Sequence, residues 1–209
     1  MKRQGGLIDE SKNVYSHFTK IPYKTQAKLW EFPSGATIGF SAISCDDDLG
    51  SWQGSQLTRI LIDEAGDKWT EKQVLFLQSR LRTVGSDIHP QLILSCNSDP
   101  NSFLFEWVKF CLDEDTGVPK EGTENTIRWF CVEDNKAKWA NSPEECYELY
   151  GKPKNLIYAH GLTEEQINKF SAEEKLRLFM PKSFRFIPTG VFDNPYLLPP
   201  KNNSYLASL

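Results

Sequence analysis

The chain has 209 residues, a formal net charge of −4 and a hydrophobic content of 39%. This composition is typical of a soluble, folded globular protein and argues against a disordered chain. The negative net charge also excludes an overall basic surface, so any contact with nucleic acid must be local. The length suits one substantial domain, at most with a small appended subdomain.

Cysteine and histidine positions argue against a disulfide framework, a metal site or a Cys–His nucleophile. The five cysteines are scattered and form no C-x-x-C pair, and the three histidines are isolated from them and from one another: Cys45, Cys96, Cys111, Cys131, Cys146, His17, His89 and His160. No apolar segment follows the basic start, and no run approaches the roughly 18 residues of a membrane span. We therefore expect an intracellular, soluble protein in a reducing compartment, with no membrane partner.

The first half of the chain predicts a hairpin followed by a buried strand. The run Lys28–Ser41 contains two short apolar segments around a Pro-Ser-Gly turn. An acidic, turn-rich stretch, Asp46–Gly50, and a predicted tight turn at Trp52–Gly54 come next. The continuous apolar run Arg59–Ile62 ends in Asp63 and Glu64, and it predicts a strand buried on both faces.

Alternating helical and apolar segments then predict an α/β fold. A helix is predicted over Thr70–Arg82, because Thr70 and Gln73 form a capping-box pattern before apolar residues at helical spacing. The second strand, Gln91–Leu94, ends in Ser95, Cys96 and Asn97, and Ser102–Leu112 predicts another helix. Such alternation favours a parallel, doubly wound sheet with helices on both faces.

The second half carries weaker patterns. A strand is predicted over Thr126–Val132, a short helix over Pro143–Tyr150 and a longer helix over Thr163–Phe179. The segment Pro181–Leu209 contains five prolines and Asn-rich turns, so we expect an extended linker or strap.

Two adjacent carboxylates after an apolar strand have the form of a Walker B strand. In that interpretation Asp63 holds Mg²⁺ through water and Glu64 polarises the water that attacks the γ-phosphate. The alternative is a solvated turn, because strands that end in Asp-Glu are common. The small polar end of the next strand, Ser95–Asn97, favours the first interpretation, since it would lie where an ATPase senses the γ-phosphate.

Two arginines are candidates for stabilising a transferring phosphate. Arg80 and Arg82 are predicted at the end of the intervening helix, and a guanidinium is the group that serves this purpose in trans. The alternative is that both simply complement the helix dipole. A G-x-x-x-x-G-K-[ST] loop, which cradles a triphosphate, is absent from the sequence, as is a G-x-S-x-G elbow.

A set of segments, in order, resembles the large subunit of bacteriophage terminases. These segments are Gly5–Ser11, Phe32–Ala36, Trp52–Gly54, Ile60–Ala65, Ser79–Arg82 and Cys96–Pro100. The segment Asp193–Leu197, followed by Tyr205-Leu206, resembles the stretch that closes the ATPase lid before the nuclease domain of that family. The ordered set spans nearly the whole chain and is more specific than any one motif.

The resemblance implies an ASCE-type ATPase with ATP and Mg²⁺ as cofactors. On matching positions Asp63 and Glu64 take the Walker B roles, and Ser95, Cys96 and Asn97 form the motif that couples hydrolysis to movement. The implied partners are double-stranded viral DNA, the portal protein, a small terminase subunit and further copies in a ring. The implied location is the host cytoplasm, at the procapsid portal. Gln53 stands where some terminases carry their arginine finger, which leaves Arg80 and Arg82 as candidates.

The resemblance also implies a division of the chain. We expect residues 1–130 to form an ATPase core portion and residues 131–209 to form a lid and a linker toward a nuclease domain. The Walker A segment and the nuclease are expected outside these residues, possibly in separately encoded chains, so the isolated chain is expected neither to hydrolyse ATP efficiently nor to cut DNA. Two alternatives remain: another ASCE ATPase such as a helicase, and a non-catalytic fragment that completes a partner's sheet.

Overall fold

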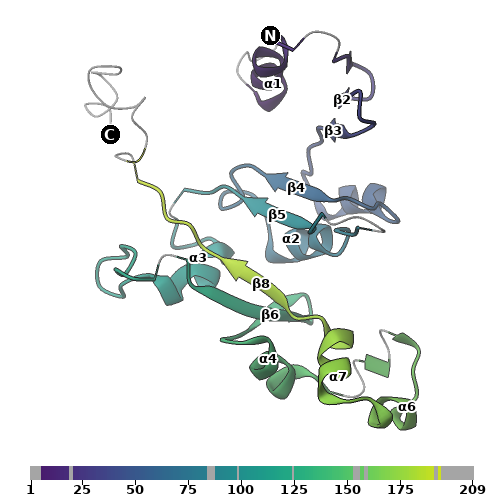
Figure 1. Ribbon diagram of the computed structural model, residues 1–209. Coiled ribbons are helices and arrows are strands. Elements are labelled where there is room, and N and C mark those ends of the chain that lie inside the picture. Colours follow the sequence, from purple (N-terminus) through teal and green to yellow (C-terminus); the bar gives the residue numbers. More distant parts are fainter. Residues whose placement is uncertain are drawn as a thin grey trace. The chain divides into compact units, whose positions relative to one another are not determined.

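The computed structural model describes residues 6–18, 21–83, 88–97, 99–123, 125–152, 156–157, 160–190 and 193 (Figure 1). The chain forms two compact units, Met1–Gln53 and Gly54–Leu209. The predicted division at residue 130 concerns functional parts and stays a prediction. Within the described ranges, no helix is both long and apolar enough to cross a membrane. The motif residues Gly5, Ser98, Asn194–Leu197 and Tyr205-Leu206 lie outside these ranges.

The first unit packs one helix on a small antiparallel sheet. Its elements are α1 (Leu7–Tyr15), β1 (Tyr23–Lys24), β2 (Leu29–Glu31), β3 (Thr37–Gly39) and the 3-10 helix η1 (Asp46–Trp52). The predicted hairpin is confirmed as β2 and β3, and Gly35 takes a φ of 83° in their turn. The helix α1 was not predicted, because its N-cap residue is Gly6, which has no side chain to cap the helix.

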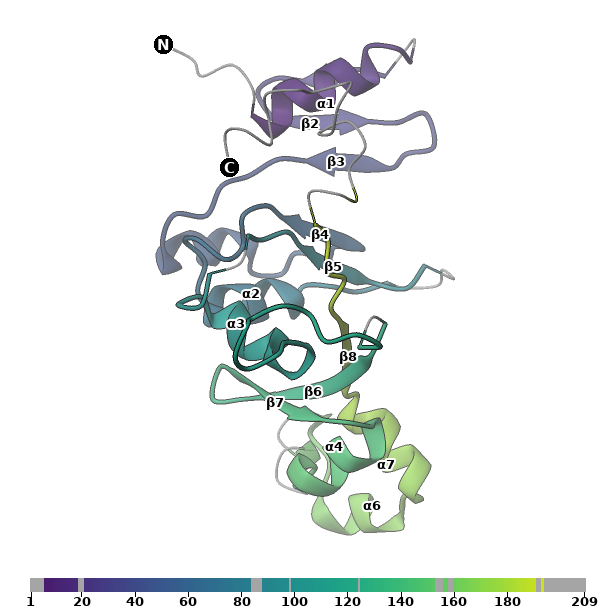
Figure 2. The ribbon, with the colours of Figure 1, turned by 90° about the vertical axis from the view of Figure 1, so that its left-hand side faces the viewer.

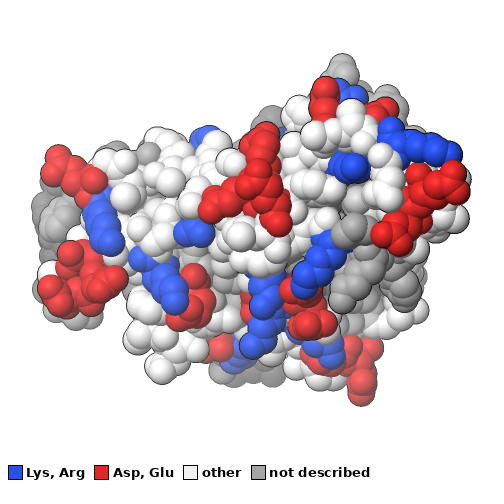
Figure 3. All heavy atoms as spheres, turned by 90° about the horizontal axis from the view of Figure 1, so that it is seen from below, with Lys and Arg blue, Asp and Glu red and all other residues white. Residues whose placement is uncertain are grey.

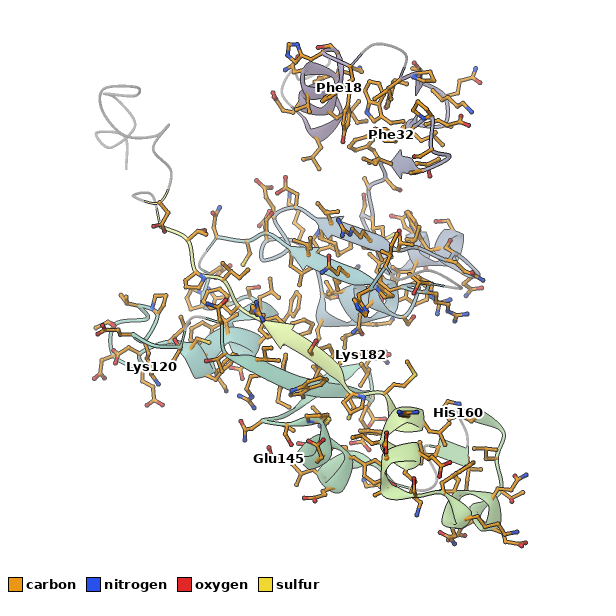
Figure 4. All side chains as sticks on the ribbon, in the orientation of Figure 1. Phe18, Phe32, Lys120, Glu145, His160 and Lys182 are labelled. Atoms are coloured by element: carbon orange, nitrogen blue, oxygen red, sulfur yellow. The ribbon has the colours of Figure 1, made fainter. Side chains whose placement is uncertain are left out.

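An aromatic cluster holds the first unit together. Trp30 is 5% exposed and lies 5.2 Å from the ring of Tyr15, which is also 5.4 Å from the ring of Phe32. The indole nitrogen of Trp30 donates to Ser11 Oγ on α1 at 3.0 Å. Figure 4 shows Phe18 and Phe32 on this unit. Aromatic burial therefore connects the helix to the sheet.

The second unit begins with a parallel β–α–β segment. It consists of β4 (Arg59–Ile62), α2 (Glu71–Gln78) and β5 (Gln91–Leu94), with Ile62 opposite Leu94 in register. The predicted capping box of Thr70 and Gln73 is present at the start of α2. The helix ends at Gln78, earlier than the predicted Arg82, because Leu81 instead bridges Leu57 beside β4.

The prediction that β4 is buried on both faces was wrong. Ile62 is 4% exposed, whereas Leu61 is 71% exposed and its register partner Ile93 is 47% exposed. Figure 2 shows α2 along one side of the pair, and its residues Val74, Leu75 and Leu77 are buried. An apolar run reveals that a strand can be buried, but it does not reveal whether an element covers each face.

A second, antiparallel sheet follows, with the strand order β7-β6-β8. Its strands are β6 (Ile127–Glu133), β7 (Lys136–Ala140) and β8 (Lys182–Arg185). Asp134 and Asn135 join β6 to β7 with φ values of 52° and 58°, as a two-residue hairpin turn of type I′ requires. The strand β8 lies at the start of the segment predicted as a linker, and it pairs with β6 instead.

Helices lie on both sides of this second sheet (Figure 2). On one side α3 (Phe103–Val108), followed by η2 (Lys109–Cys111), places Trp107 against three aromatic rings at 5.6 to 5.9 Å, those of Phe130, Trp139 and Phe184. On the other side α4 (Pro143–Tyr150) buries Cys146 beside Cys131. Burial raises the pKa of the Cys131 thiol to about 12, and the Cys146 thiol adds to the effect.

The predicted helix over Thr163–Phe179 is two helices, α6 (Glu164–Lys169) and α7 (Ala172–Phe179). The break occurs because Phe170 is extended and Ser171 starts a new capping box with Glu174. The ring of Phe179 on α7 packs 5.5 Å from that of Tyr147 on α4. His160, labelled in Figure 4, lies 2.8 Å from the carbonyl oxygen of Leu178.

The fold is therefore mixed α/β, as predicted, but it is not one doubly wound sheet. The described strands form three small sheets, of which only β4–β5 is parallel. In the second unit α2 and α3 lie between the β4–β5 pair and the second sheet, and α4 and α7 lie beyond that sheet (Figure 2). The predicted alternation holds only as far as β5, because the later strands pair as antiparallel neighbours.

Candidate functional site

The parallel pairing of β4 and β5 brings together the polar residues that follow each strand. The backbone nitrogen of Ser95 donates to the carbonyl oxygen of Ile62 at 3.0 Å, and the nitrogen of Ala65 donates to that of Ser95 at 2.8 Å. These bonds continue the ladder beyond the last strand residues. The carboxyl ends of parallel strands meet at one sheet edge, so Asp63 and Ser95 become neighbours, as the sequence predicted.

Ser95 also connects the two segments through its side chain. Its hydroxyl donates to Asp63 Oδ1 at 2.6 Å and accepts the backbone N–H of Glu64 at 3.2 Å. All three residues are exposed. The structure thus brings together Asp63, Glu64 and Ser95 at a surface that a ligand can reach.

Glu64 has an unusual backbone conformation. Its φ is 52°, in the left-handed region that side chains other than those of Gly, Asn and Asp seldom adopt. A residue other than glycine in that region costs on the order of 1 kcal/mol or more, and such residues occur in turns and cluster at functional sites. Because the backbone turns at Glu64, side chains stop alternating between the two faces of the strand directly after Asp63.

Gly66 allows the two strand ends to approach closely. A Cβ atom at this position would lie 3.2 Å from Cys96 Cβ, 3.5 Å from the carbonyl oxygen of Asn97 and 3.5 Å from Ser102 Oγ. Ser102 caps α3, and its hydroxyl accepts the N–H of Leu104 at 3.2 Å. The loop after β4, the segment after β5 and the start of α3 therefore form one packed region. Burial there raises the pKa of the Cys96 thiol.

The two candidate arginines lie at the opposite end of the strand. The backbone N–H of Leu57 donates to the carbonyl oxygen of Arg80, and the backbone N–H of Arg82 donates to the carbonyl oxygen of Leu57. Leu57 precedes Asp63 by six residues, which is on the order of 15–20 Å of extended chain. The prediction that both arginines end the helix α2 was wrong, and the fold does not bring them to the carboxylates of the same chain.

Their side chains also differ in availability. The Arg80 guanidinium lies 4.8 Å from the Phe76 ring and donates to Ser79 Oγ at 2.8 Å. Arg82 is exposed. Of the two, Arg82 is the one whose side chain faces solvent.

The sequence interpretation missed Glu71, the first residue of α2. Its Oε1 atom accepts the indole N–H of Trp107 at 3.0 Å and the backbone N–H of Ala137 at 2.9 Å. One carboxylate thus joins α2, α3 and β7. An acidic residue in the first turn of a helix is so common that its pattern carried no signal.

Oxygen ligands are available for a magnesium ion. Asp63 and Ser95 supply carboxylate and hydroxyl oxygens, which are the donors that Mg²⁺ prefers. Nowhere among the described residues do three or more His, Cys, Asp or Glu side chains converge as metal ligands. A magnesium ion at this site would therefore take most of its ligands from water and phosphate, as it usually does in nucleotide enzymes.

Charge gives no sign of a basic face in the view of Figure 3. Lys and Arg side chains alternate there with Asp and Glu side chains. This agrees with the net charge of −4. The face shown offers no continuous positive area for DNA.

The geometry defines the chain as an α/β protein with polar groups beyond the ends of parallel strands, where such proteins bind ligands. The family described as "Terminase large subunit, T4likevirus-type, N-terminal" matches residues 9–180, most of the chain. The chain belongs to this family of terminase large subunits, and the resemblance stated from the sequence is confirmed. No curated protein and no solved structure matches it.

Family membership implies a role in packaging phage DNA. DNA and the packaging machinery are therefore its implied partners. The matched range includes both strand ends of the site and both arginines, and it stops just before β8.

Proposed function

We propose that this chain provides the hydrolytic carboxylates of the ATP-driven motor that moves double-stranded viral DNA into the procapsid. The observation that carries the proposal is the hydrogen bond from the Ser95 hydroxyl to the Asp63 carboxylate. It lies beside Glu64, at the end of a parallel strand pair. Together with β4, these residues have the form of a Walker B strand and its neighbour in an ASCE ATPase.

Each carboxylate has a separate role. Asp63 would hold Mg²⁺ through the ion's water ligands, and the ion would supply positive charge beside the phosphates. Glu64 accepts a hydrogen bond from the water that attacks the γ-phosphate and so aligns it. The 209 residues contain no G-x-x-x-x-G-K-[ST] loop, so hydrolysis is expected in the assembled motor and not in the isolated chain.

Assembly into a ring would supply the arginine. A ring of copies on the portal, in the host cytoplasm, would allow Arg82 to reach the nucleotide of a neighbouring copy, because its side chain is exposed. A small terminase subunit would select the viral DNA. Arg80 is the weaker candidate, since Phe76 and Ser79 already engage its guanidinium.

The test uses the phage that encodes the chain. Asp63→Asn and Glu64→Gln are introduced separately, and the amount of nuclease-protected DNA in procapsids is measured. We expect each variant to package at least about 100-fold less DNA, the scale on which a positioned acid or base acts. Asp67→Asn is the matched control, because Asp67 is an exposed carboxylate of the same loop. Normal packaging by both variants would refute the proposal.

A second candidate is a non-catalytic fragment that completes a partner's sheet. The exposure of Leu61 and Ile93, 71% and 47%, favours it, because an uncovered apolar sheet face is a site for association. In that case Leu61→Asp would abolish packaging while Asp63→Asn would not. Membership in the terminase family favours packaging over the helicase alternative.

A further inference from the structure

We infer that Ser95 is a positioning residue that fixes Asp63 and Glu64 relative to each other before nucleotide binds, and that it does not contact the γ-phosphate. This inference rests on the proposed function. It changes the role expected for Ser95 from the sequence, where the polar strand end predicted a phosphate sensor.

The hydrogen-bonding capacity of Ser95 carries the argument. A serine hydroxyl has one proton to donate. Here Ser95 donates it to Asp63 Oδ1 at 2.6 Å, a distance typical of a strong bond to a carboxylate. The same oxygen accepts the N–H of Glu64 at 3.2 Å. A phosphate oxygen could therefore bond to Ser95 only by displacing Asp63.

The backbone of Ser95 holds this hydroxyl in place. Its nitrogen donates to Ile62, and its carbonyl oxygen accepts from Ala65. Ser95 is thus anchored on both sides of the Asp63–Glu64 pair. The side-chain bonds then fix the Asp63 carboxylate and the left-handed backbone of Glu64 together, although the two residues belong to the other strand.

Asn97 is better suited than Ser95 to contact a phosphate. It follows Ser95 by two residues and is exposed, and its side-chain amide makes no hydrogen bond within the described part of the chain. An amide N–H₂ group donates two hydrogen bonds. Positioning and phosphate contact are therefore separate functions of neighbouring residues.

The experiment measures amide hydrogen exchange in the nucleotide-free, full-length chain. Ser95→Thr and Ser95→Val form a matched pair, because the two side chains have similar shapes and only threonine keeps the hydroxyl. We expect the Glu64 amide to exchange roughly 3- to 10-fold faster in Ser95→Val, which corresponds to one lost hydrogen bond. In Ser95→Thr the rate should stay within about twofold of the parent chain.

Two controls separate this effect from a general loss of structure. Ser183→Val changes a serine of β8, far along the chain, and should leave the Glu64 amide unaffected. The amide of Ala137, which donates to Glu71, should exchange at the parent rate in all three variants. If Ser95→Val does not fold, Ser95→Ala replaces it with the same expectation.

The outcome also distinguishes this inference from the proposed function. Equal Glu64 exchange in the Thr and Val variants would overturn the positioning role, whatever the packaging result. If the Glu64 amide exchanges faster in Ser95→Val but Asp63→Asn and Glu64→Gln both package normally, Ser95 has the positioning role and the proposed hydrolytic function fails. In the phage, Asn97→Ala should lower packaging without changing Glu64 exchange in the free chain. A faster Glu64 exchange in Asn97→Ala would contradict the division of roles.

Discussion

The two sheets of the second unit differ in how they are covered. The β7-β6-β8 sheet has α3 on one side and α4 on the other, and Trp107 is only 3% exposed among its aromatic rings. The β4–β5 pair has α2 on one side, and on the other Leu61 is 71% exposed. The pair that carries the candidate site is therefore the less packed of the two.

The difference in covering means that one sheet contributes mainly to the stability of the unit and the other carries the candidate site. Burial of large aromatic side chains contributes most to the stability of a domain, and the second sheet contains the larger share of it. The β4–β5 pair instead exposes Asp63, Glu64 and Ser95 to solvent. Substitutions in the two sheets should consequently have different effects on unfolding and on packaging.

The largest effect on stability is expected at Trp107. Trp107→Ala should lower the free energy of unfolding of the second unit by about 3–5 kcal/mol, because it removes a buried indole and leaves a cavity. Hydrogen exchange of the β6 amides measures this free energy directly. Trp30→Ala, which removes a buried indole whose ring and hydrogen-bond partners all belong to the first unit, should leave those amides unchanged. A loss below about 1 kcal/mol in Trp107→Ala would contradict the contrast between the sheets.

The two faces of β4 provide the next test. Ile62→Ala should lower the unfolding free energy by about 2–4 kcal/mol, whereas Leu61→Ala should change it by less than about 0.5 kcal/mol. The neighbouring residues differ in exposure, 4% against 71%. Urea-induced unfolding followed by circular dichroism provides the comparison. Equal losses would show that Leu61 is covered in solution.

A smaller effect is expected at Glu71, which joins α2 to the second sheet. Glu71→Leu should cost about 1–3 kcal/mol, because the N–H groups of Trp107 and Ala137 lose their acceptor. Glu71→Gln keeps an oxygen at the same position, so its cost should be below about 1 kcal/mol. The β6 amides report both variants by hydrogen exchange. Equal costs for the two variants would mean that the charge of Glu71, which both remove, matters more than its acceptor atom.

The smallest expected change is a gain in stability at Glu64. Glu64→Gly should raise the unfolding free energy by about 0.5–1 kcal/mol, because glycine adopts a φ of 52° without strain. Glu64→Ala removes the same carboxylate but keeps the strain, so its stability should match that of the parent chain. Thermal unfolding measures both. Both variants should fail to package DNA, and a stable, active Glu64→Gly would argue against the proposed role of this side chain.

Local patterns in the sequence predicted the elements that local chemistry determines. The capping box at Thr70, the hairpin turn at Gly35 and the polar ends of β4 and β5 could all be predicted from a few adjacent residues. Membership in the terminase family followed from the order of several such segments and is confirmed.

Features that depend on distant residues could not be predicted. The exposure of Leu61 depends on which elements cover its face, and the position of Arg82 depends on the pairing of Leu81 with Leu57. The bonds from Trp107 and Ala137 to Glu71 connect residues that are 36 and 66 positions apart. No periodicity within a single segment contains such information.

Positions 64 and 66 reverse the usual choice of residues in a turn. The left-handed backbone, where proteins commonly use glycine, belongs to Glu64, while Gly66 is needed for the space it leaves beside Cys96. A protein engineer who optimised this loop by backbone preference alone would place glycine at 64 and a larger residue at 66. The glycine at 64 would relax the turn, and the side chain at 66 would press on Cys96. Selection for thermostability at position 64 would therefore favour the loss of the carboxylate on which the motor is proposed to depend.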